Sequence, residues 1–147
     1  MRYLLTAAAL TMATTAICAE DLPKVTRVID GRKTTYPEKT IRDGVRALSD
    51  VLEACHYLAD SRFENGKEIQ YTADDVKTAQ KGDHVRFVFS KLLLVDVLDK
   101  ELDVSEAVFA NGAFWLVCKK GVVRCSKYEH DKMDRFEKWY RQTLPTD

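Results

Sequence analysis

The side chains best suited to chemistry are the cysteines Cys55, Cys118 and Cys125, which follow an N-terminal segment that holds the fourth, Cys18. Six residues separate Cys118 from Cys125, so a turn near Gly121 places the two thiols opposite or diagonal on neighbouring strands. In an oxidising compartment this arrangement predicts a disulfide that stabilises the fold by about 2–3 kcal/mol. Cys55 is then either a buried free thiol or an alternative partner for one of the two.

The spacing of these residues disfavours both thiol catalysis and a zinc site. The chain has no CxxC, and the interval between Cys118 and Cys125 is not that of a metal knuckle. Cys55 and His56 are neighbours about 100° apart on a helix, a poor arrangement for a nucleophile and its base. No HExxH, GxSxG, P-loop or dinucleotide glycine pattern occurs. We therefore expect no catalytic residue, metal ligand or cofactor, while an enzyme without a recognisable motif stays open.

A candidate binding surface lies near the C-terminus, where aromatic side chains are flanked by mixed charges. Aromatic and arginine side chains are common anchors of protein interfaces. One interpretation of this pattern is an interface made by Arg135, Trp139, Tyr140 and Arg141, although helical spacing accounts for most of the aromatic stripe. Helical spacing offers a second interpretation, in which Phe136 and the two neighbouring aromatic side chains pack on a sheet.

Residues 1–19 have the composition of a secretory signal peptide, with a positive start, an apolar stretch over 3–16 and a small residue, Ala19, before an acidic pair. The stretch is too short to span a bilayer, which takes about 20 strongly apolar residues. Ile17 stands where a lipoprotein signal needs a small residue, so lipidation is not expected. We expect cleavage after Ala19, which leaves residues 20–147 as a periplasmic or secreted protein with no further membrane insertion.

The composition of the chain describes one ordinary globular domain. It has 147 residues, of which 46% are hydrophobic and 31% charged, with 23 basic and 23 acidic side chains. Such a balance excludes a disordered tail and a coiled coil. Zero net charge argues against a nucleic-acid partner, which would require a basic surplus.

Two stretches carry the apolar spacing of amphipathic helices and predict a long helix over 38–62 and a terminal helix over 127–143. The stripe of the long helix comprises Ile41, Val45, Leu48, Leu52, Cys55 and Ala59. Asn65-Gly66 is expected to end this helix. A short helix is expected over 72–82, between the long helix and the strands.

Alternating apolar residues predict the strands that follow, over 85–90, 92–98, 102–109, 114–119 and 122–126. Residues 20–36 show no sustained period and are expected to form an extended lead-in, with a short edge strand at 25–29.

Two turns fix the expected register of these strands. Asn111-Gly112 is a strong hairpin signal, because both residues tolerate the positive φ of a type I′ turn, and it pairs Phe109 with Phe114. The same register pairs Val108 with Trp115 and Glu106 with Val117. A second two-residue turn at Asp99-Lys100 would pair Val97 with Leu102 and Val95 with Val104.

The expected register divides the sheet into two apolar faces, both of which need cover. One face carries Val95, Val97, Leu102, Val104, Val108, Trp115 and Val117. The other carries Leu92, Leu94, Phe109, Phe114, Leu116 and Cys118.

The sequence thus predicts an α+β fold in residues 37–147, with a four- to five-stranded antiparallel meander packed by a long N-terminal helix and a C-terminal helix. Its leading functional interpretation is a non-enzymatic envelope protein that binds another protein, as an inhibitor, immunity or accessory factor would. The alternative is a small-molecule or lipid carrier with an apolar pocket between helix and sheet, near Trp115 and Phe87.

Overall fold

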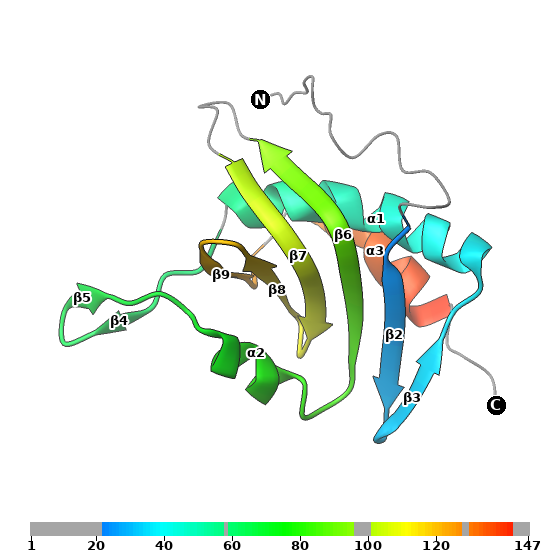
Figure 1. Cartoon of the computed structure of the whole chain (residues 1–147), viewed down its shortest axis with the longest axis horizontal. Helices are drawn as coiled ribbons and strands as arrows, with labels where there is room; N and C mark the ends of the chain where they lie inside the picture. The colour runs from blue at the N-terminus through cyan, green and yellow to red at the C-terminus, as the bar shows by residue number, and fades with distance from the viewer. Residues whose placement is uncertain (1–21, 58, 96–100, 128–129, 143–147) are drawn as a thin grey trace.

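The computed structural model describes residues 22–57, 59–95, 101–127 and 130–142, which form an α+β fold with an antiparallel sheet (Figure 1). The predicted signal peptide, 1–19, lies outside the described residues. The elements are β2 (Lys24–Ile29), β3 (Arg32–Thr35), α1 (Glu38–Tyr57), β4 (Phe63–Glu64), β5 (Lys67–Glu68), α2 (Ala73–Ala79), β6 (His84–Val95), β7 (Glu101–Ala110), β8 (Ala113–Cys118), β9 (Gly121–Cys125) and α3 (His130–Gln142). The main sheet has six strands in the order β3-β2-β6-β7-β8-β9, and β4 and β5 form a separate two-stranded sheet.

The main sheet has more strands than the four or five predicted, because much of the expected lead-in over 20–36 forms a hairpin. The β2 strand pairs with β6 and also with β3, so it lies inside the sheet and not at its edge. Asp30 and Gly31 join β2 to β3 with φ of 51° and 79°, the positive values that a type I′ turn requires.

The β6 strand is one long element where two strands were predicted. Its register with β7 shifts between Val88 and Leu92, which bends the strand without ending it. Val95 pairs with Glu101 and Leu94 with Leu102, so the predicted pairs of Val95 with Val104 and Val97 with Leu102 are wrong. The prediction assumed a turn of two residues, whereas the last pair, Val95 with Glu101, leaves the five residues 96–100 between the two strands. The predicted Asp99-Lys100 turn lies outside the described residues.

The register of β7 with β8 confirms the prediction made from Asn111-Gly112. Phe109 pairs with Phe114, Val108 with Trp115 and Glu106 with Val117. Farther along, an irregularity between Val104 and Glu106 shifts the pairing by one residue. The shift changes the face on which side chains lie, because neighbouring strand residues point to opposite sides. Val104 is therefore buried on the face of Phe109, and Leu102 packs on the same face, whereas both were predicted on the face of Val108.

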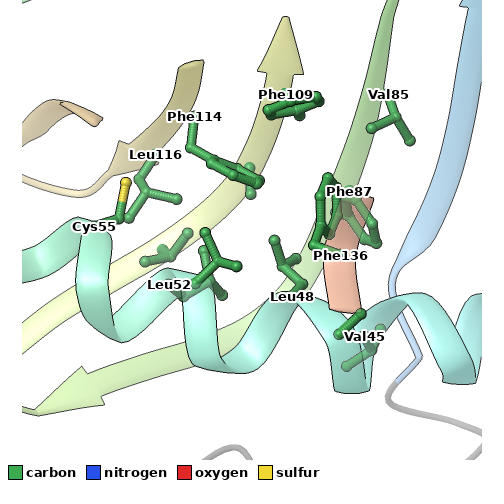
Figure 2. Packing of buried hydrophobic residues seen from close by; sticks show 14 of the residues in the cluster. Val45, Leu48, Leu52, Cys55, Val85, Phe87, Phe109, Phe114, Leu116 and Phe136 are labelled. Carbon is green, nitrogen blue, oxygen red and sulfur yellow. The ribbon is translucent and has the colours of Figure 1, made fainter. Parts of the chain in front are cut away.

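Helices α1 and α3 cover one face of the sheet and bury the larger core (Figure 2). Most of the predicted stripe of α1 is confirmed, since Val45, Leu48, Leu52 and Cys55 are buried and Ile41 is partly buried. Its last member, Ala59, is exposed, because it lies beyond the end of the helix. Helix α1 ends at Tyr57, earlier than the predicted residue 62, and α3 falls within its predicted range. The largest fully buried side chains include Phe87, Phe114, Phe136, Leu48, Leu52 and Leu116.

Helix α2 covers part of the opposite face. Its Val76 packs in a smaller cluster with Val108, Ala110, Trp115 and Val122. Both faces of the sheet are thereby covered at their centre, as the two apolar faces of the sequence require. None of the helices within the described ranges has the length and apolarity needed to cross a membrane.

Candidate functional site

The hairpin β4–β5 projects from the body of the molecule (Figure 1). Asn65 and Gly66 form its turn with φ of 53° and 77°, values that closely match those at Asn111-Gly112. No residue from 61 to 70 belongs to either core cluster. At 63% exposure, Phe63 is the one large hydrophobic side chain recorded as exposed among the described residues. The sequence prediction missed this element because it assigned Asn65-Gly66 to the end of α1, although the dipeptide is a hairpin signal.

Asp60 fastens the start of the hairpin to β9. Its backbone N–H donates to the carbonyl of Arg124 at 2.6 Å, and its carboxylate forms an ion pair with the Arg124 guanidinium. The Ser126 hydroxyl and backbone N–H both donate to Asp60 Oδ1, at 3.1 and 3.4 Å. The Asp60 side chain is only 8% exposed and that of Arg124 29%, so solvent screens this pair less than an exposed one. These tertiary bonds give the chain after Tyr57 partners outside the helix.

Arg62 links the hairpin to the start of α2. Its guanidinium forms ion pairs with Asp75 at 2.7 Å and Glu64 at 3.3 Å, and both raise the pKa of Arg62. Asp75 also completes a capping box with Thr72. The Thr72 backbone N–H and hydroxyl, with the positive charge of Arg62, lower the pKa of Asp75, so this carboxylate is ionised at neutral pH.

Tyr71 joins the end of the hairpin to the main sheet. It forms an isolated β-bridge with Val122, and its ring meets that of Trp115 edge to face at a centroid distance of 5.4 Å. Two guanidinium carbons lie near the Tyr71 ring, that of Arg62 at 5.6 Å and that of Arg124 at 6.0 Å from its centroid. Cation–π attraction therefore adds to the ion pairs at the hairpin base.

A cavity of about 330 Å³ opens at this base, at the lower end of the size range of small-molecule sites. Its walls combine carboxylates, guanidiniums and apolar side chains from the hairpin and from β9. The lining residues are Ala59, Asp60, Arg62, Glu68, Ile69, Gln70, Tyr71, Val122, Val123 and Arg124. The structure therefore places a cavity with mixed polar and apolar walls at the base of the hairpin that exposes Phe63, which no motif in the sequence indicated.

The cysteines do not form the predicted disulfide, and Cys55, Cys118 and Cys125 are all buried free thiols. The β8–β9 turn lies at Lys119-Lys120, so Cys118 pairs with Gly121 while Cys125 lies four positions farther along, opposite Phe114. Rise along a strand is about 3.3 Å per residue, which separates the two thiols well beyond bonding range.

The structure instead brings Cys55 of α1 to Cys125 of β9, where the two thiols share a hydrogen bond. Burial and this contact raise the pKa of Cys55 well above its usual value, while the same bond lowers the pKa of Cys125. Burial, with the nearby Asp103 charge, raises the pKa of Cys118 to about 11. Buried thiols whose pKa is raised, here Cys55 and Cys118, are poor nucleophiles.

Of the four candidate interface residues on α3, the largest, Trp139, packs in the core, as the helical spacing indicated. Trp139 is buried against Gly44, and its indole N–H donates to the Thr40 carbonyl at 3.0 Å. Tyr140 is partly buried, whereas Arg135 and Arg141 are exposed. The aromatic stripe of this helix therefore packs in the core, and of the four candidate residues Arg135 and Arg141 are exposed.

Arg27 is a buried cation that the sequence prediction also missed. Its side chain is 5% exposed and donates to the Tyr140 carbonyl at 2.6 Å and to the Tyr36 hydroxyl at 3.3 Å. Its guanidinium carbon lies 3.7 Å from the centroid of the Tyr140 ring. The C-terminus of a helix carries partial negative charge, so the end of α3 and the ring stabilise this cation.

Two further points of the sequence analysis concern metal ligands, of which none is expected, and an apolar pocket near Trp115 and Phe87. Within the described ranges, no group of three or more His, Cys, Asp or Glu residues could hold a metal ion. Phe87 belongs to the larger core and Trp115 to the smaller one, on opposite faces of the sheet, so one pocket does not contain both. No protein family, curated protein or solved structure matches this chain.

Proposed function

We propose that this protein is an exported factor of the cell envelope that binds another protein, as an inhibitor, immunity or accessory factor, and docks through the β4–β5 hairpin. The observation that carries the proposal is a projecting hairpin that adds nothing to either core and exposes Phe63. Projecting aromatic side chains among charged neighbours are common anchors of protein interfaces.

Stability alone gives little reason to order this segment. Fixing each backbone residue costs roughly 1–2 kcal/mol of conformational entropy, and an isolated two-stranded hairpin is marginal in water. The contacts of Asp60, Arg62 and Tyr71 offset that cost at the base while Phe63 stays exposed. A segment held in one conformation loses less entropy when it binds, which favours a docking role.

Export is the second part of the proposal and rests on the composition of residues 1–19. The expected outcome is a protein recovered from the envelope fraction or the medium whose first residue is Glu20. Cell fractionation with intact-mass measurement checks this result. Recovery of the uncleaved chain from the cytoplasm would overturn the export proposal.

The docking role is tested by affinity capture from the envelope fraction of the protein's own host, comparing wild type with Phe63→Ser and Arg141→Ala. We expect a stoichiometric protein partner for wild type and for Arg141→Ala, and at least about a tenfold loss of capture for Phe63→Ser, the effect of losing an anchor residue. Loss with Arg141→Ala and retention with Phe63→Ser would move the interface to α3. Absence of any partner would contradict the binding role.

A further inference from the structure

Phe63 and Glu68 lie on the same face of the projecting hairpin. Glu64 and Lys67 flank the two-residue turn, and Phe63 and Glu68 are the next opposed pair. The Ile69 N–H donates to the Arg62 carbonyl at 2.7 Å, so Arg62 and Ile69 form a hydrogen-bonded pair. Hydrogen-bonded and non-hydrogen-bonded pairs alternate along an antiparallel ladder, so the neighbouring Phe63–Glu68 pair is of the non-hydrogen-bonded kind. Side chains of such pairs are the closer of the two kinds. An exposed aromatic ring therefore lies beside a carboxylate.

The charges around the cavity leave Glu68 without a partner. Arg62 is engaged by Asp75 and Glu64, and Arg124 by Asp60. No cation among residues 22–57, 59–95, 101–127 and 130–142 forms an ion pair with Glu68, which is exposed and lines the cavity. Among the four charged residues that line the cavity, Glu68 is therefore the one whose charge is left to pair with an incoming cation.

The cavity walls suit a side chain that is apolar along its length and charged at its end. Ile69, Val122 and Val123 contribute apolar wall and Tyr71 an aromatic ring. Asp60, Arg62 and Arg124 also line the cavity but are held in ion pairs, so Glu68 contributes the carboxylate that has none. Lysine and arginine have this character, because an aliphatic stem carries the cationic head. A volume of about 330 Å³ accommodates one such side chain.

We propose that the partner of this protein presents a lysine or arginine that enters the cavity and pairs with Glu68, beside an apolar residue that packs on Phe63. This inference rests on the proposed function and specifies the chemistry of the partner surface. Apolar contact with Phe63 supplies most of the affinity, and the charge of Glu68 selects the partner.

The first test uses two matched peptides, acetyl-Gly-Leu-Arg-Leu-Gly-amide and the same peptide with Glu in place of Arg, titrated into the ¹⁵N-labelled protein at about 0.15 M salt. We expect the arginine peptide to shift amide signals from residues 60–71 and 122–124, and the glutamate peptide to bind about tenfold more weakly. Equal binding of the two peptides, tighter binding of the glutamate peptide, or shifts confined to other residues would overturn the inference.

The second test compares Glu68→Gln and Glu68→Lys with Glu101→Gln, a matched loss of one exposed carboxylate on β7. We expect about threefold weaker binding of the arginine peptide for Glu68→Gln, about tenfold for Glu68→Lys, and no change for Glu101→Gln. Circular dichroism checks that each variant is folded.

Capture from the envelope separates the two proposals. If Phe63→Ser abolishes capture and Glu68→Lys leaves it intact, the docking role stands and the basic partner is wrong. Loss of capture with both variants, together with retention by Glu101→Gln, supports both proposals. Failure of wild type to capture a partner contradicts the proposed function itself, whatever the peptides do.

Discussion

The helix-covered face of the sheet and the base of the β4–β5 hairpin are held together by different forces. On the covered face, the Phe136 ring packs against Phe87, Phe109 and Phe114 at centroid distances of 6.3, 5.2 and 4.9 Å. At the hairpin base, Asp60, Arg62 and their partners form ion pairs and hydrogen bonds with little apolar burial. The first region is stabilised by close packing of apolar side chains, and the second by ion pairs and hydrogen bonds.

This difference separates stability from recognition within one small fold. Apolar packing is non-directional and favours a dry interior, so the covered face is suited to holding the fold and offers little to a partner. Directional bonds at the hairpin base fix a projecting element without covering it. The variants below test that division, beginning with the largest expected loss of stability.

Phe136→Ala is expected to lower the free energy of unfolding by about 3–5 kcal/mol, because it leaves a cavity among the rings of the covered face. Phe136 is fully buried, whereas Phe63 is mostly exposed. The same truncation at Phe63 is therefore expected to change stability by no more than about 0.5 kcal/mol. Urea denaturation measures the free energy of unfolding of both variants. Equal losses of stability would contradict the proposed difference between the two regions.

Gly44→Ala is expected to destabilise the protein by about 1–3 kcal/mol through overpacking. A Cβ on Gly44 would lie 2.5 Å from a ring carbon of Trp139, which is itself buried. Alanine favours a helix over glycine by about 1 kcal/mol, but the clash with a rigid indole outweighs that gain.

Gly82→Ala serves as the control, because a Cβ there meets no atom within 4 Å. We expect a change between zero and a gain of about 1 kcal/mol. Thermal unfolding compares the two variants. A stabilising Gly44→Ala would show that α1 and α3 pack less tightly than their contacts indicate.

Asp60→Asn is expected to lower global stability by about 1–2 kcal/mol, less than the loss from Phe136→Ala. The variant leaves Arg124 without its carboxylate while an amide oxygen can still accept from Ser126. Its larger effect should be local: the variant should speed amide hydrogen exchange of residues 61 to 70 more than exchange of the main sheet. An equal increase in exchange rate across the main sheet would contradict the idea that the Asp60 contacts hold the hairpin separately from the rest of the fold.

Acid should release the contact between Arg62 and Asp75 while the apolar face stays intact. The pKa of Asp75 is lowered from 3.8, so its stabilising effect is complete above that pH and is lost as pH falls through the lower native value. NMR signals of residues 62–75 should report the transition, and Asp75→Asn should remove it. A transition of the same midpoint in that variant would assign it to another carboxylate.

The success of the sequence predictions depended on how local the signal was. Asn111-Gly112 predicted the β7–β8 register correctly, because the turn requires positive φ at both residues and that requirement belongs to the dipeptide. Asn65-Gly66 carried the same information, yet it followed an apolar helical stripe and was assigned to the helix end. Asp30-Gly31, a third turn of this kind, was passed over as part of a lead-in.

The hairpin and its cavity could not be predicted in the same way, since their contacts join residues far apart in the chain. Asp60 finds Arg124 and Ser126, and Arg62 finds Asp75, only after β9 and α2 are in place. A sequence shows four ordinary charges at these positions. Their pairing leaves Glu68 without a counterion among the residues that the structure describes, which is a property of the assembled site.

By itself, the sequence determined the α+β class, the buried stripe of α1 and the register at Asn111-Gly112, because each depends on periodicity or turn chemistry within a short segment. Tertiary structure alone decided that Val104 turns to the helix-covered face, that Trp139 is buried and that Cys125 meets Cys55. These outcomes follow from a bulge, a helix–helix contact and a strand offset. Each depends on the distance between segments that only folding brings together.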